Sequence, residues 1–178
     1  NLAIGAFSLQ YNTTAAGNTA LGYGSLAYTT IGGGNTAVGS NALYRNTTGI
    51  RNEAFGYSSL YSNTTGSYNI GLGYNSFGTT TANNTGNDNI GIGESALFDN
   101  TTGSQNTAVG SAILSSNTTG QGNSAFGYQS LFSNTTGSQN TTVGALSMLY
   151  NTTGTSNASL GYAALSNNTT GSGNIGIG

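Results

Sequence analysis

Large apolar residues recur along the chain with a period of 17 residues, and small or polar residues separate them. We number the repeat from its first residue: position 1 is Asn, position 4 is apolar, position 5 is Gly and position 9 is Leu, except for Phe77 and Met148. Most copies close with Asn-Thr-Thr-Gly and two variable residues. The copies begin at Asn1, Asn18, Asn35, Asn52, Asn69, Asn89, Asn106, Asn123, Asn140 and Asn157, and a partial eleventh copy spans 174–178.

The copies form a single array over residues 1–178. Nine copies have 17 residues, and the fifth, residues 69–88, has 20 because of three extra residues after Phe77. The chain starts at Asn1 without an initiator Met or a signal segment, so we expect it to be a segment of a longer protein.

Two short strands per copy are predicted, at positions 2 to 4 and at positions 8 to 11, separated by the Gly of position 5 and by the Asn-Thr-Thr-Gly turn. The frequent Gly, Asn, Thr and Ser disfavour a helix. The chain has 25 Asn and 30 Gly but no Asn-Gly or Asp-Gly pair, so hairpins are disfavoured, and it has no Pro to interrupt a ladder. The predicted fold class is therefore all-β, a parallel β-solenoid of 17-residue coils.

In such a stack each position becomes a column with a rise of about 4.8 Å per coil. We expect the apolar columns of positions 4 and 9 to face each other inside the coil, and the small residue of position 3 to let a second surface approach. The Asn of position 1 is predicted to form an amide ladder. Its members are Asn18, Asn35, Asn52, Asn69, Asn89, Asn106, Asn123, Asn140 and Asn157.

A coil with only two large apolar residues buries little surface, which favours association with other chains. Position 10 follows the inward position 9 on a predicted strand and should point outward. The candidate subunit interface is therefore the column of Tyr44, Tyr61, Phe98, Phe132 and Leu149.

The segment NTAVGSNAL at 35–43 and its relatives NTALGYGSL, NTAVGSAIL and NSAFGYQSL, which begin at Asn18, Asn106 and Asn123, resemble the head repeats of YadA-like trimeric autotransporter adhesins. Similar repeats occur in phage tail fibres and other bacterial surface fibres. The resemblance implies a left-handed β-roll, a side-by-side homotrimer and an extracellular or cell-surface location. The copy is longer than the family unit by the Asn-Thr-Thr-Gly turn, and the chain has no heptad stalk.

Composition excludes several classes of function. The chain has no Cys and no His, charged residues make up 3%, and no candidate catalytic residue or cofactor emerges, so we expect no enzyme. Two Arg and no Lys cannot neutralise the phosphates of a nucleic acid. No apolar run is long enough for insertion into a membrane.

The few charged residues leave one candidate ion site. Asp88, Glu94 and Asp99, with Asn84 and Asn87, offer oxygen ligands for Ca²⁺ beside the extra residues of the fifth copy. The alternatives are an acid pair that cleaves glycosides and, as the favoured interpretation, charges that only aid solubility.

The polar turns and exposed aromatics suggest further candidates. The turns match the N-glycosylation motif, and we interpret them as turn formers in which Asn tolerates left-handed backbone. The motif occurs at Asn12, Asn46, Asn63, Asn100, Asn117, Asn134, Asn151 and Asn168. Candidate ligand contacts are the loop Thr79 to Asn87 and the tyrosines of position 6, which are Tyr23, Tyr57, Tyr74, Tyr128 and Tyr162. For these tyrosines, packing against the next copy is the alternative.

These patterns predict a structural and adhesive segment of an extracellular bacterial or phage fibre. Its expected partners are further copies of itself, as a trimer, and a cell-surface or glycan receptor. Two alternatives remain open. One is a solenoid subunit that polymerises end to end into a filament, and the other is an ice-binding solenoid that uses its threonine columns.

Overall fold

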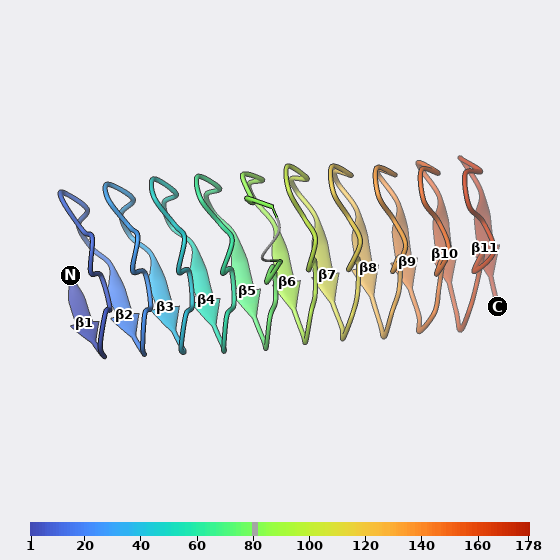
Figure 1. The fold of residues 1–178 in the computed structure, drawn as a ribbon. Helices are drawn as coiled ribbons and strands as arrows, with labels where there is room; N and C mark the ends of the chain where they lie inside the picture. The colour runs from blue at the N-terminus through green and yellow to red at the C-terminus, as the bar shows by residue number, and fades with distance from the viewer. Residues whose placement is uncertain (80–81) are drawn as a thin grey trace.

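The structure, a computed structural model that describes residues 1–79 and 82–178, is a single stack of coils with one short strand in each coil (Figure 1). All eleven strands lie in one parallel sheet in chain order, and no helix occurs among the described residues. The strands are β1 (Leu2–Ile4), β2 (Thr19–Leu21), β3 (Thr36–Val38), β4 (Glu53–Phe55), β5 (Ile70–Leu72), β6 (Ile90–Ile92), β7 (Thr107–Val109), β8 (Ser124–Phe126), β9 (Thr141–Val143), β10 (Ala158–Leu160) and β11 (Ile175–Ile177). The predicted all-β parallel solenoid is confirmed.

Equivalent positions of neighbouring coils pair directly in the sheet. Thr19 pairs with Thr36 and Ala20 with Ala37, a step of one repeat. The longer fifth copy keeps the same register, since Ile70 pairs with Ile90. The extra residues therefore leave the ladder of strands undisturbed.

The prediction of a second strand at positions 8 to 11 is wrong. Positions 7 and 9 have left-handed backbone, as at Asn41 and Leu43 with φ of 59° and 50°. Positions 8 and 9 are both buried, as Ala42 and Leu43 are, whereas a strand would turn one of them outward. Coils still pair here, because the N–H of Leu26 donates to the carbonyl of Ala42 at 3.0 Å. The segment is thus a series of turns held from coil to coil.

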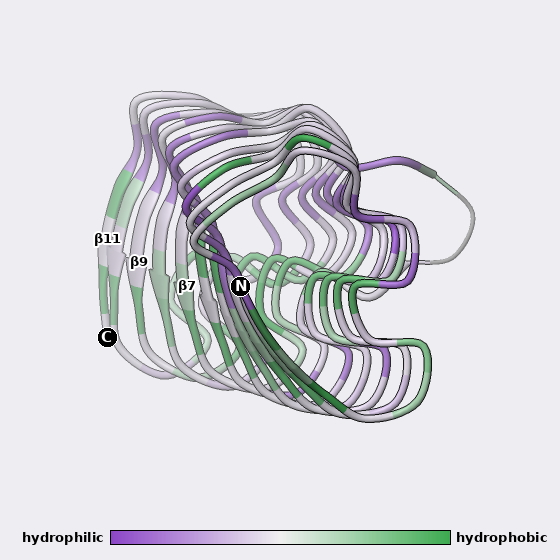
Figure 2. Ribbon diagram, turned by 90° about the vertical axis from the view of Figure 1, so that its left-hand side faces the viewer, coloured by the Kyte–Doolittle hydropathy of each residue, from purple (hydrophilic) through white to green (hydrophobic). Residues whose placement is uncertain are grey.

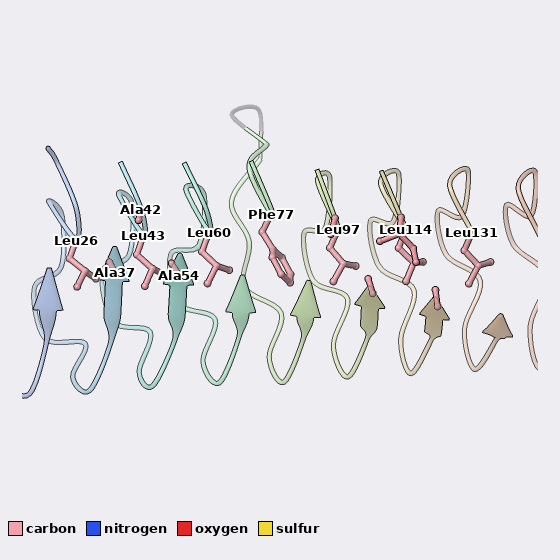
Figure 3. Close-up of a cluster of buried hydrophobic side chains, with 14 of the residues drawn as sticks. Leu26, Ala37, Ala42, Leu43, Ala54, Leu60, Phe77, Leu97, Leu114 and Leu131 are labelled. Atoms are coloured by element: carbon pink, nitrogen blue, oxygen red, sulfur yellow. The ribbon is translucent and has the colours of Figure 1, made fainter. Parts of the chain in front are cut away.

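The side chain that faces position 9 comes from position 3, so the expectation that position 4 fills the interior is also wrong. Ala37 and Ala54 are fully buried in the middle of their strands. A Cβ on Gly91 would lie 2.6 Å from Cε2 of Phe77. The interior therefore has small residues on the strand side, since position 3 is Ala, Gly, Ser or Thr in every copy, and Figure 3 shows a row of large residues above the strands, including Leu26, Leu43 and Leu60.

The asparagines of position 1 form a buried amide ladder along the stack. The side-chain oxygen Oδ1 of Asn106 accepts hydrogen bonds from the backbone N–H and the Nδ2 of Asn123, at 3.0 and 3.1 Å. Nδ2 of Asn123 also donates to the carbonyl of Gly137 at 2.9 Å. Each amide is therefore shared between two coils and the turn of its own coil.

The turn asparagines form a second ladder beside the first. Nδ2 of Asn117 donates to Oδ1 of Asn100 at 2.8 Å and to the carbonyl of Gly120 at 3.1 Å. Position 12 does not have left-handed φ, and neither does the Gly of position 15. Glycine is required at position 15 because the asparagine side chain of the same turn leaves no space for a Cβ. A Cβ on Gly103 would lie 2.4 Å from Oδ1 of Asn100.

Removing one amide from the first ladder should destabilise the stack. In Asn123→Ala, the buried N–H and Nδ2 of Asn140 lose the acceptor Oδ1, while Oδ1 of Asn106 loses the Nδ2 donor and keeps the backbone N–H of residue 123, so we expect a loss of about 3 kcal/mol in free energy of unfolding. Urea unfolding and amide hydrogen exchange measure the change. Asn167→Ala, which removes an exposed amide, is the matched control and should change stability by less than about 0.5 kcal/mol. Equal losses in the two variants would contradict the role of the ladder.

The fit between positions 3 and 9 predicts a compensating pair of substitutions. Gly91→Ala should overpack the coil against Phe77 and destabilise it by about 1–3 kcal/mol. Adding Phe77→Leu should restore most of this loss, because Leu26 and Ala37 already form that combination elsewhere in the chain. A double-mutant cycle in urea measures the coupling. Purely additive effects would show that the two side chains do not meet.

Candidate functional site

The outer face of the sheet carries an unbroken column of apolar side chains. They are the residues of position 4, which alternation along the strand turns away from the interior. The column consists of Ile4, Leu21, Val38, Phe55, Leu72, Ile92, Val109, Phe126, Val143, Leu160 and Ile177. Leu21, Phe126 and Leu160 are 44%, 41% and 53% exposed. Figure 2 shows hydrophobic colouring along this wall of strands.

The same face is nearly free of charge. Position 2 also points outward and contributes Ile70 and Ile90 next to threonines, and among the described residues only Glu53 is charged at positions 2 and 4. Between β9 and β11 the face is hollowed by about 260 Å³, with Val143, Leu160 and Ile177 in the lining. A continuous apolar stripe of this kind is typical of an interaction surface.

A second feature is a series of aromatic rings on the wall opposite the strands, at positions 10 and 11. The rings of Tyr11 and Tyr28 stack with centroids 4.9 Å apart, and those of Tyr44 and Tyr61 stack at 5.2 Å. Tyr28 and Tyr44 join the two pairs edge to face at 5.1 Å. Four consecutive coils thus share one run of tyrosines.

Hydrogen bonding to Tyr28, followed by desolvation, raises the pKa of Tyr44 above its ordinary value of 10.0. Both effects favour the neutral phenol. The phenol of Tyr44 therefore stays neutral and offers its hydroxyl group to a ligand.

Both arginines of the chain lie against tyrosine rings. The guanidinium carbon of Arg45 is 5.3 Å from the ring centroid of Tyr61, and that of Arg51 is 5.6 Å from that of Tyr68. Arg51 also donates from Nη1 to the Tyr68 hydroxyl at 3.3 Å. No carboxylate of the described part of the chain forms an ion pair with either arginine.

The candidate interface residues of position 10 are half-buried. Tyr44, Tyr61, Phe98, Phe132 and Leu149 lie within the wall opposite the sheet and expose less of their surface than Leu21, Phe126 and Leu160 of the column of position 4. Their part in association stays a prediction. The sequence analysis missed Tyr11, Tyr28 and Arg45 at position 11, although aromatic residues at positions 10 and 11 of adjacent copies were a usable signal.

The tyrosines of position 6 are exposed, at 50–72% of their surface. Tyr57 and Tyr74 stack with centroids 5.5 Å apart, and Tyr23 meets Phe7 edge to face at 5.3 Å. They pack on each other where copies adjoin and leave their outer surfaces available to a ligand. The candidate loop Thr79 to Asn87 includes residues 80 and 81, which lie outside the described residues.

The structure does not bring the three candidate calcium ligands together. Asp88, Glu94 and Asp99 occupy positions 17, 6 and 11, which lie on different sides of the coil. Among the residues that the structure describes, no three His, Cys, Asp or Glu side chains gather as a metal site would require. Oδ1 of Asn87 accepts a hydrogen bond from the N–H of Ser67 at 2.8 Å, and Oδ1 of Asn84 accepts one from the N–H of Gly86 at 2.9 Å.

The glycosylation motifs and the threonines are largely engaged in the turn. Six of the eight motif asparagines are fully or almost fully buried, with Nδ2 of Asn134 donating to Asn117 and to Gly137. A folded coil therefore has no free amide there to carry a glycan. At position 13, threonine hydroxyls donate to the next coil, as Thr118 does to the carbonyl of Thr135 at 3.1 Å. Only position 14 presents an exposed threonine column at this turn.

Comparison with known proteins gives no match: no family model, curated protein or solved structure corresponds to the chain. In the described residues, no helix is long and apolar enough to cross a membrane. Two surfaces therefore carry the functional argument, namely the apolar column of the sheet and the run of tyrosines opposite it.

Proposed function

We propose that this chain is a structural and adhesive segment of an extracellular bacterial or phage fibre, in which three copies pack side by side through the outer faces of their sheets. The observation that carries the proposal is the column of position 4, because it leaves apolar side chains uncovered along the whole stack. The resemblance to YadA-like head repeats supports the trimer and the attachment role.

A second copy of the same chain is the occupant that matches this face best. The column advances by one apolar side chain per coil, and another coil stack has the same advance. Two such columns can interdigitate over their full length, whereas a partner without this period meets only a few coils. The match of periods therefore favours self-association.

A rod made this way suits attachment outside the cell. The backbone ladder makes it stiff along its axis, and the chain has only two Arg and no Lys as cleavage sites for trypsin-like proteases. With the sheet faces covered, the tyrosine wall of each copy remains on the outside of the assembly. That wall is where a cell-surface or glycan receptor would bind.

Native mass and one substitution test the assembly. We expect a mass near three times 17.8 kDa for the purified chain. Phe126→Asp places a charge within the column and should weaken association at least tenfold, since an unpaired buried charge costs several kcal/mol. Native mass spectrometry and light scattering give the mass and its concentration dependence.

The matched control is Tyr128→Asp, which places the same charge on an exposed side chain two residues away. It should leave the mass unchanged. A monomeric wild-type chain would overturn the proposed assembly, a dimer would overturn the trimer alone, and an open-ended series of sizes would favour the filament.

A further inference from the structure

Three adjoining hollows lie on the tyrosine wall, and we refer to them together as the aromatic groove. The central hollow, about 290 Å³, is lined by Tyr28, Tyr44, Arg45, Thr47 and Tyr61. The hollow on its N-terminal side shares Tyr28 and Tyr44 with it, and the hollow on its C-terminal side shares Tyr61. A ligand in the groove would therefore lie along the axis of the stack and cross several coils.

The groove belongs to the first six coils. Its flanking hollows add Tyr23 at one end and Tyr57, Tyr74 and Phe98 at the other. In the later coils, four of the eight residues at positions 10 and 11 are serine, and the described residues there form no stacked or edge-to-face ring pair. The aromatic groove is thus a departure from the repeat and is not required by the stacking itself.

The lining combines ring surfaces with groups that bind hydroxyls and anions. Amides come from Gln10, Asn41 and Asn75, and hydroxyls come from Thr47 and the tyrosines. Arg45 supplies the groove's only positive charge, and no carboxylate lines any of the three hollows. Its guanidinium therefore has donors for a ligand carboxylate, which a planar guanidinium binds with two parallel hydrogen bonds.

We propose that the aromatic groove binds a linear acidic oligosaccharide along the coil axis, with sugar rings against Tyr28, Tyr44 and Tyr61 and a sugar carboxylate on Arg45. Because Tyr11 stacks on Tyr28 and Tyr44 stacks on Tyr61, the sugars contact ring edges and phenol hydroxyls, and sugar hydroxyls pair with these phenols and with the lining amides. Centroid spacings of 4.9–5.2 Å along the run are comparable to the length of one sugar residue. The choice of a glycan rests on the proposed attachment function, while the groove itself does not.

A proline-rich peptide is the competing occupant, because such peptides also bind aromatic-lined grooves. It would use the rings but has no acidic group for Arg45, and it would leave most amides of the lining without partners. The single unpaired cation among tyrosines and amides therefore favours the acidic sugar.

The test is titration calorimetry of the full chain with tetragalacturonate as the acidic probe, and with cellotetraose and decaproline as neutral probes. We expect tetragalacturonate to bind, to bind more weakly as salt increases, and to bind at least tenfold more tightly than cellotetraose. Tyr28→Ala and Arg45→Gln should each weaken binding of tetragalacturonate about tenfold. Tyr28 is 40% exposed, so its truncation leaves the core intact.

Each variant has a control at an equivalent or related residue outside the groove. Tyr150 occupies the same position as Tyr28 in the ninth coil, and Arg51 is the other arginine, stacked on Tyr68. Tyr150→Ala and Arg51→Gln should bind tetragalacturonate within twofold of the wild type. Absence of tetragalacturonate binding, equal losses in the control variants, or binding of decaproline in its place would overturn the proposal.

Native mass measured on the same samples separates this proposal from the proposed assembly. Tyr28→Ala and Arg45→Gln should keep the mass of the wild type, since the groove lies opposite the sheet. A monomer that binds tetragalacturonate would overturn the trimer and support the groove. A trimer that does not bind it would support the assembly and overturn the groove.

Discussion

The spacing between consecutive coils is set by backbone hydrogen bonds, and most of the sequence pattern follows from that one distance. At almost every residue, the backbones of neighbouring coils must lie about 4.8 Å apart, which is the separation of paired strands. At the edges of the coil this leaves no room for a side chain: a Cβ on Gly39 would lie 2.4 Å from the carbonyl oxygen of Gly56. Glycine at position 5 also has a φ of 121–148°, which side chains disfavour. The absence of Pro has the same origin, because each coil uses its N–H groups to hold the next.

Close stacking also explains an interior that is largely polar. Asn106 and Asn117 each place an amide inside the coil, and each amide bonds to its equivalent in the neighbouring coils. Buried amides are tolerated because a regular stack satisfies them. The same repetition holds Leu43 and its equivalents in left-handed backbone, a conformation that costs about 1–2 kcal/mol per residue in isolation. Periodicity thus stabilises local structures that a single coil would not adopt.

The period, the parallel stack and the strands at positions 2 to 4 could be predicted from the sequence, because they depend on spacing and on residue types that recur in every copy. The turns at positions 7 to 9, which replace the expected second strand, could not be predicted. They depend on left-handed φ at residues such as Leu26 and Ser58, whose residue types do not indicate that conformation. The inward side of the strand was misassigned because apolar character was taken to mark the interior. The small residue of the strand faces the interior instead: Ala37 is buried opposite the leucines, and the larger Val38 lies on the outer face. The groove was missed because it combines side chains from different positions of the repeat, such as Tyr28 and Tyr44.

Two kinds of residue are under different constraints. Some are the same in every coil, and others differ from coil to coil. The asparagines, the glycines and the column of position 4 recur throughout, and each contributes to contacts that repeat along the axis, either within the stack or, as we propose, between stacks. Arg45, Phe77 and the tyrosine run break the repeat, and the stack does not require them. Recognition of one ligand at one place needs such departures, because a fully periodic surface offers the same contacts at every coil. In the proposed fibre, assembly is expected to depend on the recurring positions and ligand binding on the residues that break the repeat.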